Sequence, residues 1–153
     1  MTRREVPLDA SAILRALAEH QVEYIVIGGL AVQAYGHPRT TQDLDLLPEP
    51  SSENLERLRA ALTELGAGPV GTGHPAPVDV PHDGVLKLDT DAGGVDVHVK
   101  PPGAAPYAEL RARALEVELD TPVLVVGRDD LIATKRASDR QIDRADIVAL
   151  TEP

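Results

Sequence analysis

The sequence predicts an α+β, or mixed α/β, fold in which a β-sheet is flanked by helices. Three observations support this class: strand and helix patterns alternate irregularly along the chain, no internal repeat is present, and 42% of the residues are apolar. A length of 153 residues indicates a single domain over 1–153, with a core at about 22–126 and a C-terminal helix pair at about 128–150.

The N-terminal elements follow from hydrophobic periodicity. Apolar residues at helical spacing, after a capping Asp9, predict a helix over 10–20. The short β-branched run YIVI at 24–27 is typical of a buried strand, and it ends at a Gly-Gly pair. A short helix over 30–36 is expected to follow, with Gly36 as its stop.

The next strand carries two acids. Residues 41–47, TQDLDLL, alternate with period two, which places Asp43 and Asp45 on one face and Leu44 and Leu46 on the other. Taken alone, this alternation is typical of a half-exposed strand with a solvated polar side.

The middle of the chain is a leucine-patterned helix followed by a long loop. Leucines at helical spacing predict a helix over 52–65. Residues 66–84 are rich in Gly and Pro, and such a loop is either a functional lid or a solvated connection with one short strand near 78–80.

The remaining elements are two strand pairs and three helices. The runs VLKLDT and GVDVHVK on either side of a DAGG turn predict a β-hairpin, and LEVEL with PVLVV predicts a second strand pair. The hairpin strands are expected at 85–90 and 94–100, the second pair at 115–119 and 122–126, and the helices at about 106–114, 128–137 and 139–150.

The composition disfavours several classes of function. A net charge of −10 argues against a nucleic-acid substrate, because non-specific binding depends on basic residues that release counterions. The chain has no cysteine, which excludes disulfides and thiolate zinc sites. No apolar run reaches about 18 residues and no signal-peptide pattern is present, so we expect a cytoplasmic protein with no membrane partner.

Three acids lie in hydrophobic strand contexts: Asp43, Asp45 and Asp96. Acids are depleted from strands, and several on an inward face are costly unless a cation neutralises them. Carboxylate oxygens hold Mg²⁺ while the ion keeps waters and phosphate oxygens in its other positions. The three acids therefore predict a metal site for a nucleoside triphosphate, with one ion or with two ions about 4 Å apart.

A phosphate-binding region is predicted beside these acids. Gly28 and Gly29 would let backbone N–H groups approach a ligand, and the helix start that follows favours an anion. Arg39, Thr40 and Thr41 come immediately before the acids and would add positive charge and hydroxyl donors for phosphate oxygens.

The order of these features resembles the nucleotidyltransferase superfamily that shares the DNA polymerase β palm. That family has a strand, a Gly-Gly or Gly-Ser pair, an Asp-x-Asp pair and a later third Asp on a strand, matched here by VIGGLAVQAYG, RTTQDLDLL and GVDVHVK. The closing stretch RDDLIATKRASDRQIDRADIVAL is most similar to the small bacterial branch that contains the AbiE-type toxin nucleotidyltransferases. The resemblance implies a palm-like mixed sheet flanked by helices.

The resemblance also implies an activity and a set of roles. It implies a Mg²⁺-dependent enzyme, with Mn²⁺ as an alternative ion, that moves a nucleoside monophosphate from a nucleoside triphosphate to a hydroxyl group and releases pyrophosphate. By the family pattern Asp43 and Asp45 bind the metal, and Asp96 completes the site and helps to deprotonate the acceptor. Gly28 and Gly29 line the triphosphate.

The closing motif adds charged residues and leaves the partners open. Lys135 would neutralise charge on the triphosphate, and either Asp143 or Asp146 would match the last motif. The acceptor can be a small molecule, a protein or a tRNA, and a toxin–antitoxin role would add a protein partner. The alternative is a catalytically idle binding or antitoxin-like protein of the same fold, indicated by a chain that ends soon after the closing motif.

Two further patterns are typical of structural roles. His98 shares a strand face with Asp96 and is expected to be a partly buried histidine bonded to a neighbour, the alternative being a role in orienting Asp96 or the acceptor. Arg136, Arg140 and Arg144 lie four apart, which is typical of an exposed salt-bridged face, the alternative being a nucleic-acid patch.

Overall fold

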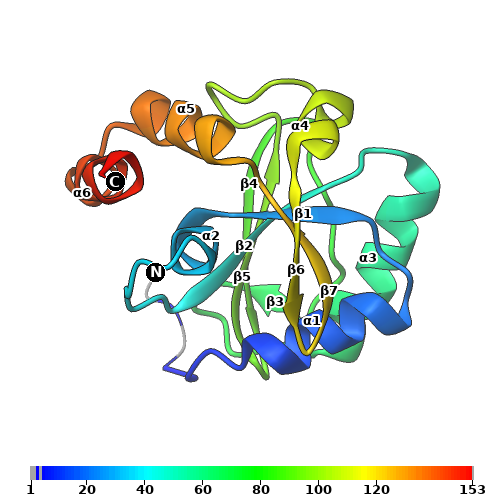
Figure 1. The fold of residues 1–153 in the computed structure, drawn as a ribbon. Coiled ribbons are helices and arrows are strands. Elements are labelled where there is room, and N and C mark those ends of the chain that lie inside the picture. The colour runs from blue at the N-terminus through cyan, green and yellow to red at the C-terminus, as the bar shows by residue number, and fades with distance from the viewer. Residues whose placement is uncertain (1–2, 4, 153) are drawn as a thin grey trace.

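The computed structural model describes residues 3 and 5–152, which form one mixed β-sheet flanked by helices (Figure 1). The strands are β1 (Tyr24–Ile27), β2 (Asp43–Pro48), β3 (Gly68–Pro69), β4 (Gly84–Thr90), β5 (Gly93–Val99), β6 (Leu115–Leu119) and β7 (Thr121–Val125). The helices are α1 (Ala10–Glu19), α2 (Gly28–Ala34), α3 (Ser52–Glu64), α4 (Tyr107–Arg113), α5 (Arg128–Ser138) and α6 (Gln141–Thr151). The predicted α+β class is confirmed.

The sheet has the strand order β3-β4-β5-β2-β1-β7-β6. Strand β2 runs antiparallel to β1 on one side and parallel to β5 on the other. The expected hairpin forms between β4 and β5, and the expected second pair forms between β6 and β7. Two strands from distant parts of the chain, β2 and β5, are therefore neighbours at the centre of the sheet.

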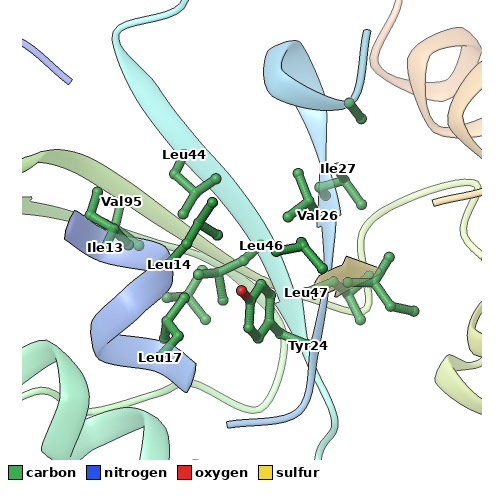
Figure 2. Packing of buried hydrophobic residues seen from close by; sticks show 14 of the residues in the cluster. Ile13, Leu14, Leu17, Tyr24, Val26, Ile27, Leu44, Leu46, Leu47 and Val95 are labelled. Carbon is green, nitrogen blue, oxygen red and sulfur yellow. The ribbon is translucent and has the colours of Figure 1, made fainter. Parts of the chain in front are cut away.

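Figure 2 shows the part of the core that lies between the sheet and α1, and Leu58 and Leu62 of α3 belong to the same buried cluster. In Figure 2, Ile13, Leu14 and Leu17 of α1 gather with Leu44 and Leu46 of β2, and each of the five side chains is at most 1% exposed. Burial of one such side chain stabilises the fold by roughly 2 kcal/mol. The predicted alternation of β2 is confirmed, because Leu44 and Leu46 enter this core while Asp43 and Asp45 stay outside it.

The turn between β4 and β5 fixes how the hairpin strands align. The Thr90 hydroxyl donates to the carbonyl of Gly93 at 2.6 Å and accepts from the backbone N–H of Ala92 at 3.0 Å. Gly93 has a φ of +110°, a conformation that side-chain-bearing residues rarely adopt. The resulting register places Asp96 of β5 across from Lys87 of β4.

The prediction of a short strand near 78–80 is wrong. That segment has no regular secondary structure, and β3 forms instead at Gly68–Pro69, where it pairs with β4. Pro77 and Pro81 flank the segment, and proline cannot donate a backbone hydrogen bond to a ladder. Val78 is nevertheless buried, so the segment packs on the core without joining the sheet.

The helices differ from expectation mainly at their ends. Helix α2 begins at Gly28, two residues before the expected start at 30, so the Gly-Gly pair forms its first turn. Helix α5 ends at Ser138, and its C-cap residue Asp139 adopts a left-handed conformation (φ 50°), so that α6 begins only at Gln141. No helix in the described part of the chain is both long enough and apolar enough to cross a membrane.

Candidate active site

Asp45 and Asp96 lie opposite each other on neighbouring strands. In the parallel pair of β2 and β5, Asp45 is matched with Asp96, and Leu44 is matched with Val95. Because alternate residues of a strand point to opposite faces, both acids leave the sheet on the face away from the leucine core. Asp96 is buried, whereas Asp45 is half-buried.

These acids line a pocket with a volume of about 530 Å³. The pocket is formed by the start of α2, the loop before β2, strands of the sheet, and α5. Of the site residues predicted from the sequence, all but Asp146 line it. They are Gly28, Gly29, Arg39, Thr40, Thr41, Asp43, Asp45, Asp96, Lys135 and Asp143.

The closest group of candidate metal ligands comprises Asp45, Asp96 and His98. Among the described residues, one ligand atom from each of these three lies within 4.8 Å of the others. His98 Nε2 is 2.8 Å from Asp45 Oδ1, which confirms the expected partly buried histidine bonded to a neighbour. Asp43 is outside this group, and the roles of all three acids as metal ligands stay predictions. Two carboxylates this close fit a divalent cation, whose usual ligands are oxygens.

The raised pKa of Asp43 reflects burial and the excess of negative charge in the site. Burial raises the pKa of Asp43 above its usual value, and the carboxylates of Asp45 and Asp96 raise it further, while Arg3 and Lys87 act in the opposite direction. The charged form of Asp43 is therefore disfavoured in the folded protein, and a divalent cation would relieve that repulsion.

Asp43→Asn is expected to stabilise the metal-free protein at neutral pH. The pKa of Asp43 is higher in the folded than in the unfolded protein, so the free energy of unfolding falls as the pH rises through these two pKa values. At low pH, where Asp43 is protonated in both states, its ionisation does not affect stability. Because the side chain is half-exposed, the gain should stay below about 1 kcal/mol. Urea unfolding in EDTA measures it at neutral and at strongly acidic pH. The exposed Asp79→Asn is the control, and an equal gain at both pH values would contradict the explanation.

The two glycines at the start of α2 leave room for side chains of the site. Gly28 has a φ of +71°, and a Cβ there would lie 2.3 Å from Asp45 Oδ2. A Cβ on Gly29 would lie 2.7 Å from Arg39 Nη1 and 3.1 Å from Thr41 Oγ1. Both glycines thus allow α2 to approach the acids and Arg39 closely, a role beyond the ligand access expected from the sequence.

Arg3 and Lys87 lie at Asp96, and neither was predicted from the sequence. Arg3 Nη2 is 2.5 Å from Asp96 Oδ1, and Lys87 Nζ is 3.7 Å from Asp96 Oδ2. The Arg3 guanidinium passes over Gly94, where a Cβ would lie 1.6 Å from Nη1. Lys87 could have been found from the alternation in VLKLDT. Arg3 is 93 positions from Asp96 and has no local signal.

Arg3→Ala is expected to tighten divalent-metal binding. The guanidinium neutralises Asp96, so an incoming cation must displace a charge-assisted hydrogen bond, which at a net value of about 1.5 kcal/mol corresponds to about ten-fold in affinity. Calorimetric titration with Mn²⁺ measures the change. Arg15→Ala, an exposed arginine on α1, should leave the affinity unaltered. Weaker binding in Arg3→Ala would show that Arg3 does not compete with the cation.

Lys135 lies in a buried ionic cluster that joins α5 to α6. Its side chain is 5% exposed, and Nζ is 2.8 Å from Asp146 Oδ2 and 3.4 Å from Asp143 Oδ1. Asp146 Oδ2 is also 3.2 Å from Arg39 Nη1, which ties α6 to the loop before β2. Asp146 therefore bridges two cations that line the pocket, although it does not line the pocket itself.

Asp143 also caps the start of α6, where Arg140 is the N-cap residue. Its Oδ2 accepts hydrogen bonds from the Arg140 backbone N–H at 3.0 Å and from Arg140 Nε at 2.8 Å. Burial raises the pKa of Asp143, but hydrogen bonds from Arg140 and Ser138 outweigh that effect and hold it well below its usual value. With Arg144 paired to Asp139 at 2.8 Å, the expected salt-bridged face is confirmed for Arg140 and Arg144.

Solved structures with the same architecture define the class of the fold. The chain superposes on the lincosamide antibiotic adenylyltransferase LnuA, lincomycin-bound, with a TM-score of 0.67 and 14% identity, over 95% of this chain and 98% of that one. It superposes on ANT(2″)-Ia in complex with adenylyl-2″-tobramycin with a TM-score of 0.63 and 18% identity, over 92% and 84% of the two chains. The fold is therefore that of nucleotidyltransferases.

A family model identifies the family within this class of fold. The model described as nucleotidyl transferase AbiEii toxin, type IV toxin–antitoxin system, matches residues 12–146. Because the match spans most of the sequence, the chain belongs to the AbiEii nucleotidyltransferase family. A comparison with curated proteins found no match. The matched range contains every predicted site residue, and the resemblance seen in the sequence is confirmed.

Proposed function

We propose that this protein is a metal-dependent enzyme that moves a nucleoside monophosphate from a nucleoside triphosphate to a hydroxyl acceptor and releases pyrophosphate. The observation that carries the proposal is the pairing of Asp45 with Asp96 on adjacent strands, inside a pocket that has a basic wall. Mg²⁺, or Mn²⁺ in its place, would be held by Asp45 and Asp96, with Asp43 beside them.

The basic wall suits the triphosphate. Arg39 Nε and Nη1 are buried and have no hydrogen-bond partner within the described part of the protein, although Nη1 lies near Asp146. Lys135 lines the same pocket, and Thr40 and Thr41 add hydroxyl groups. Cationic donors are the strongest hydrogen-bonding groups for phosphate oxygens. We assign the triphosphate to this side of the pocket.

The transfer step follows from these assignments. The acceptor hydroxyl gives its proton to Asp96 as its oxygen bonds to the α-phosphorus. The bond from the α-phosphorus to the oxygen that bridges to the β-phosphate breaks, and pyrophosphate leaves with that electron pair. Arg39 and Lys135 hold the departing phosphates. A bound divalent cation supplies electrostatic stabilisation of the attacking and leaving oxygens.

A small cationic acceptor suits the charge of the site better than a nucleic acid. The net charge of −10 repels a phosphate backbone, whereas the pocket acids attract a cation. A volume of about 530 Å³ is within the usual range for small-molecule sites. LnuA and ANT(2″)-Ia were solved with an antibiotic or an adenylylated antibiotic. We therefore propose a small hydroxyl compound with positive charge as the first acceptor class to test.

Paired isotope labels test the reaction. The protein is incubated with each of ATP, GTP, CTP and UTP, labelled at the α or the γ phosphorus, together with a divalent cation and fractionated cell extract. We expect the α label to enter an acceptor and the γ label to appear in pyrophosphate. Entry of the γ label into the acceptor would mean phosphoryl transfer instead. No label transfer and no calorimetric binding of any nucleotide would contradict the proposal.

Membership of the AbiEii family supports a toxin role as a second part of the proposal. A toxin that modifies a cellular hydroxyl acceptor should arrest growth when its expression is induced, and a protein antitoxin would be its partner. Growth curves after induction in a bacterial host test this role, and unaffected growth at confirmed expression would count against it.

A further inference from the structure

We propose that His98 is a metal ligand, and that it makes the site prefer a divalent transition-metal ion such as Mn²⁺ over Mg²⁺. The inference rests on the proposed metal site of the nucleotidyltransferase and adds a nitrogen ligand to its carboxylates. Mg²⁺ takes oxygen ligands and gives up its waters reluctantly, whereas imidazole is a common ligand of transition metals. One histidine among the acids therefore changes which ion the site selects.

The spacing of the ligand atoms supports a shared ion. Two ligands at about 2.1 Å from one ion and at right angles to each other lie about 3 Å apart. His98 Nε2 and Asp45 Oδ1 are 2.8 Å apart. A ligand atom of Asp96 lies within 4.8 Å of both. The three atoms can close on one ion with small side-chain movements, once the ion has displaced the hydrogen bond that Arg3 donates to Asp96.

The imidazole is directed into the acid group and not into solvent. His98 follows Asp96 by two positions on β5, so both side chains leave the same face of the sheet. The His98 side chain is 24% exposed, and its Nε2 faces the carboxylate of a different strand, β2. The side chain also lines the proposed nucleotide pocket, which gives an ion access to it.

Asp45 lies between His98 and the start of α2. Its Oδ1 faces His98, while its Oδ2 packs so closely on Gly28 that a Cβ there would lie 2.3 Å away. The absence of a side chain at Gly28 therefore leaves room for the carboxylate in the position that faces the imidazole. Asp45 Oδ1 and His98 Nε2 form a preset pair of ligand atoms from two strands.

A purely orienting histidine would give a different site. If His98 only donated a hydrogen bond to Asp45, every protein ligand of the ion would be an oxygen, and the site would resemble an ordinary Mg²⁺ site. The two arrangements differ in whether a nitrogen nucleus is bound directly to the ion, which spectroscopy can read without any catalytic assay.

Pulsed EPR of the Mn²⁺-loaded protein, without nucleotide, tests the inference. We expect ¹⁴N couplings of a directly bound imidazole in the wild type and in His82→Ala, which removes an exposed histidine outside the pocket. The couplings should be absent in His98→Ala, and Mn²⁺ affinity should fall by about ten-fold or more. His98→Asp, which restores an oxygen ligand, should bind Mg²⁺ at least as well as the wild type and show no ¹⁴N coupling.

Two outcomes would overturn the inference. The first is a Mn²⁺-loaded wild type without ¹⁴N coupling, a result that does not depend on the folding of any variant. The second is an unchanged ratio of Mn²⁺ to Mg²⁺ affinity in a folded His98→Ala. A protein that shows the coupling but transfers no nucleotide would support the inference and contradict the proposed function. A protein that transfers nucleotide without the coupling would overturn the inference alone.

Discussion

Asp45→Asn is expected to reduce nucleotidyl transfer by about 10³-fold or more. The substitution keeps the shape of the side chain but removes the negative charge that faces His98 and lies opposite Asp96. Electrostatic stabilisation of the displacement by a bound cation is worth several kcal/mol, and about 1.4 kcal/mol corresponds to a ten-fold change in rate. Transfer of the α label at saturating nucleotide measures the loss, with Mn²⁺ affinity determined in parallel.

Glu118→Gln is the matched control for Asp45→Asn. It also exchanges an acid for its amide, but Glu118 is exposed on β6, at the far edge of the sheet from the acids. This control should transfer nucleotide and bind metal like the wild type. Circular dichroism establishes that both variants are folded. Transfer by folded Asp45→Asn within about ten-fold of the wild type would contradict the assignment of Asp45 to the metal.

Lys135→Met is expected to lower the free energy of unfolding by about 3 kcal/mol. The side chain is 5% exposed and faces the buried carboxylates of Asp143 and Asp146. Removing one partner of a buried ion pair leaves an uncompensated charge in a low dielectric, at a cost of about 3–5 kcal/mol. Arg39 and Arg140 still face these acids, which argues for the lower end of that range. Urea unfolding at neutral pH measures the change.

Arg136→Met is the control for Lys135→Met. It removes a neighbouring positive charge from α5 and so shows how much of the loss in stability comes from charge on the helix in general and not from the buried cluster. Arg136 is exposed, and its loss should cost less than about 0.5 kcal/mol. The double variant Lys135→Met/Asp146→Asn removes both partners, and should be more stable than the sum of the single effects by about 1 kcal/mol. A cost for Lys135→Met no larger than that for Arg136→Met would show that the cluster does not stabilise the fold.

The face on which the acids lie could be predicted because strand alternation is a local property. Leu44 and Leu46 must enter the core, and this requirement alone sends Asp43 and Asp45 to the other side. The pairing of β2 with β5 could not be predicted from either strand. Parallel neighbours are brought together by long connections, and neither strand carries a local signal for its partner. Asp96 was grouped with the first two acids through its hydrophobic strand context and through the family resemblance, and neither of these predicts the strand pairing itself.

The cations of the site were the least predictable part. Lys135 was identified through the closing motif, but its burial between two acids of α6 depends on how two helices pack. Arg3 reaches Asp96 only because Gly94 has no side chain in its path, a relation between residues that are distant in sequence. The partners of long, flexible basic side chains depend on which acids lie nearby in the folded protein, so composition and periodicity do not predict those partners.

The alignment of β5 also determines how the proposed activity can be lost during evolution. A one-residue shift of β5 would turn Asp96 into the core and bring Val95 and Val97, both fully buried, into the pocket. Because the hairpin turn at Thr90 and Gly93 sets that alignment, insertion or deletion of a single codon there would damage folding and catalysis together. Inactive descendants are therefore expected to keep the strand at full length and to lose its acid by point substitution.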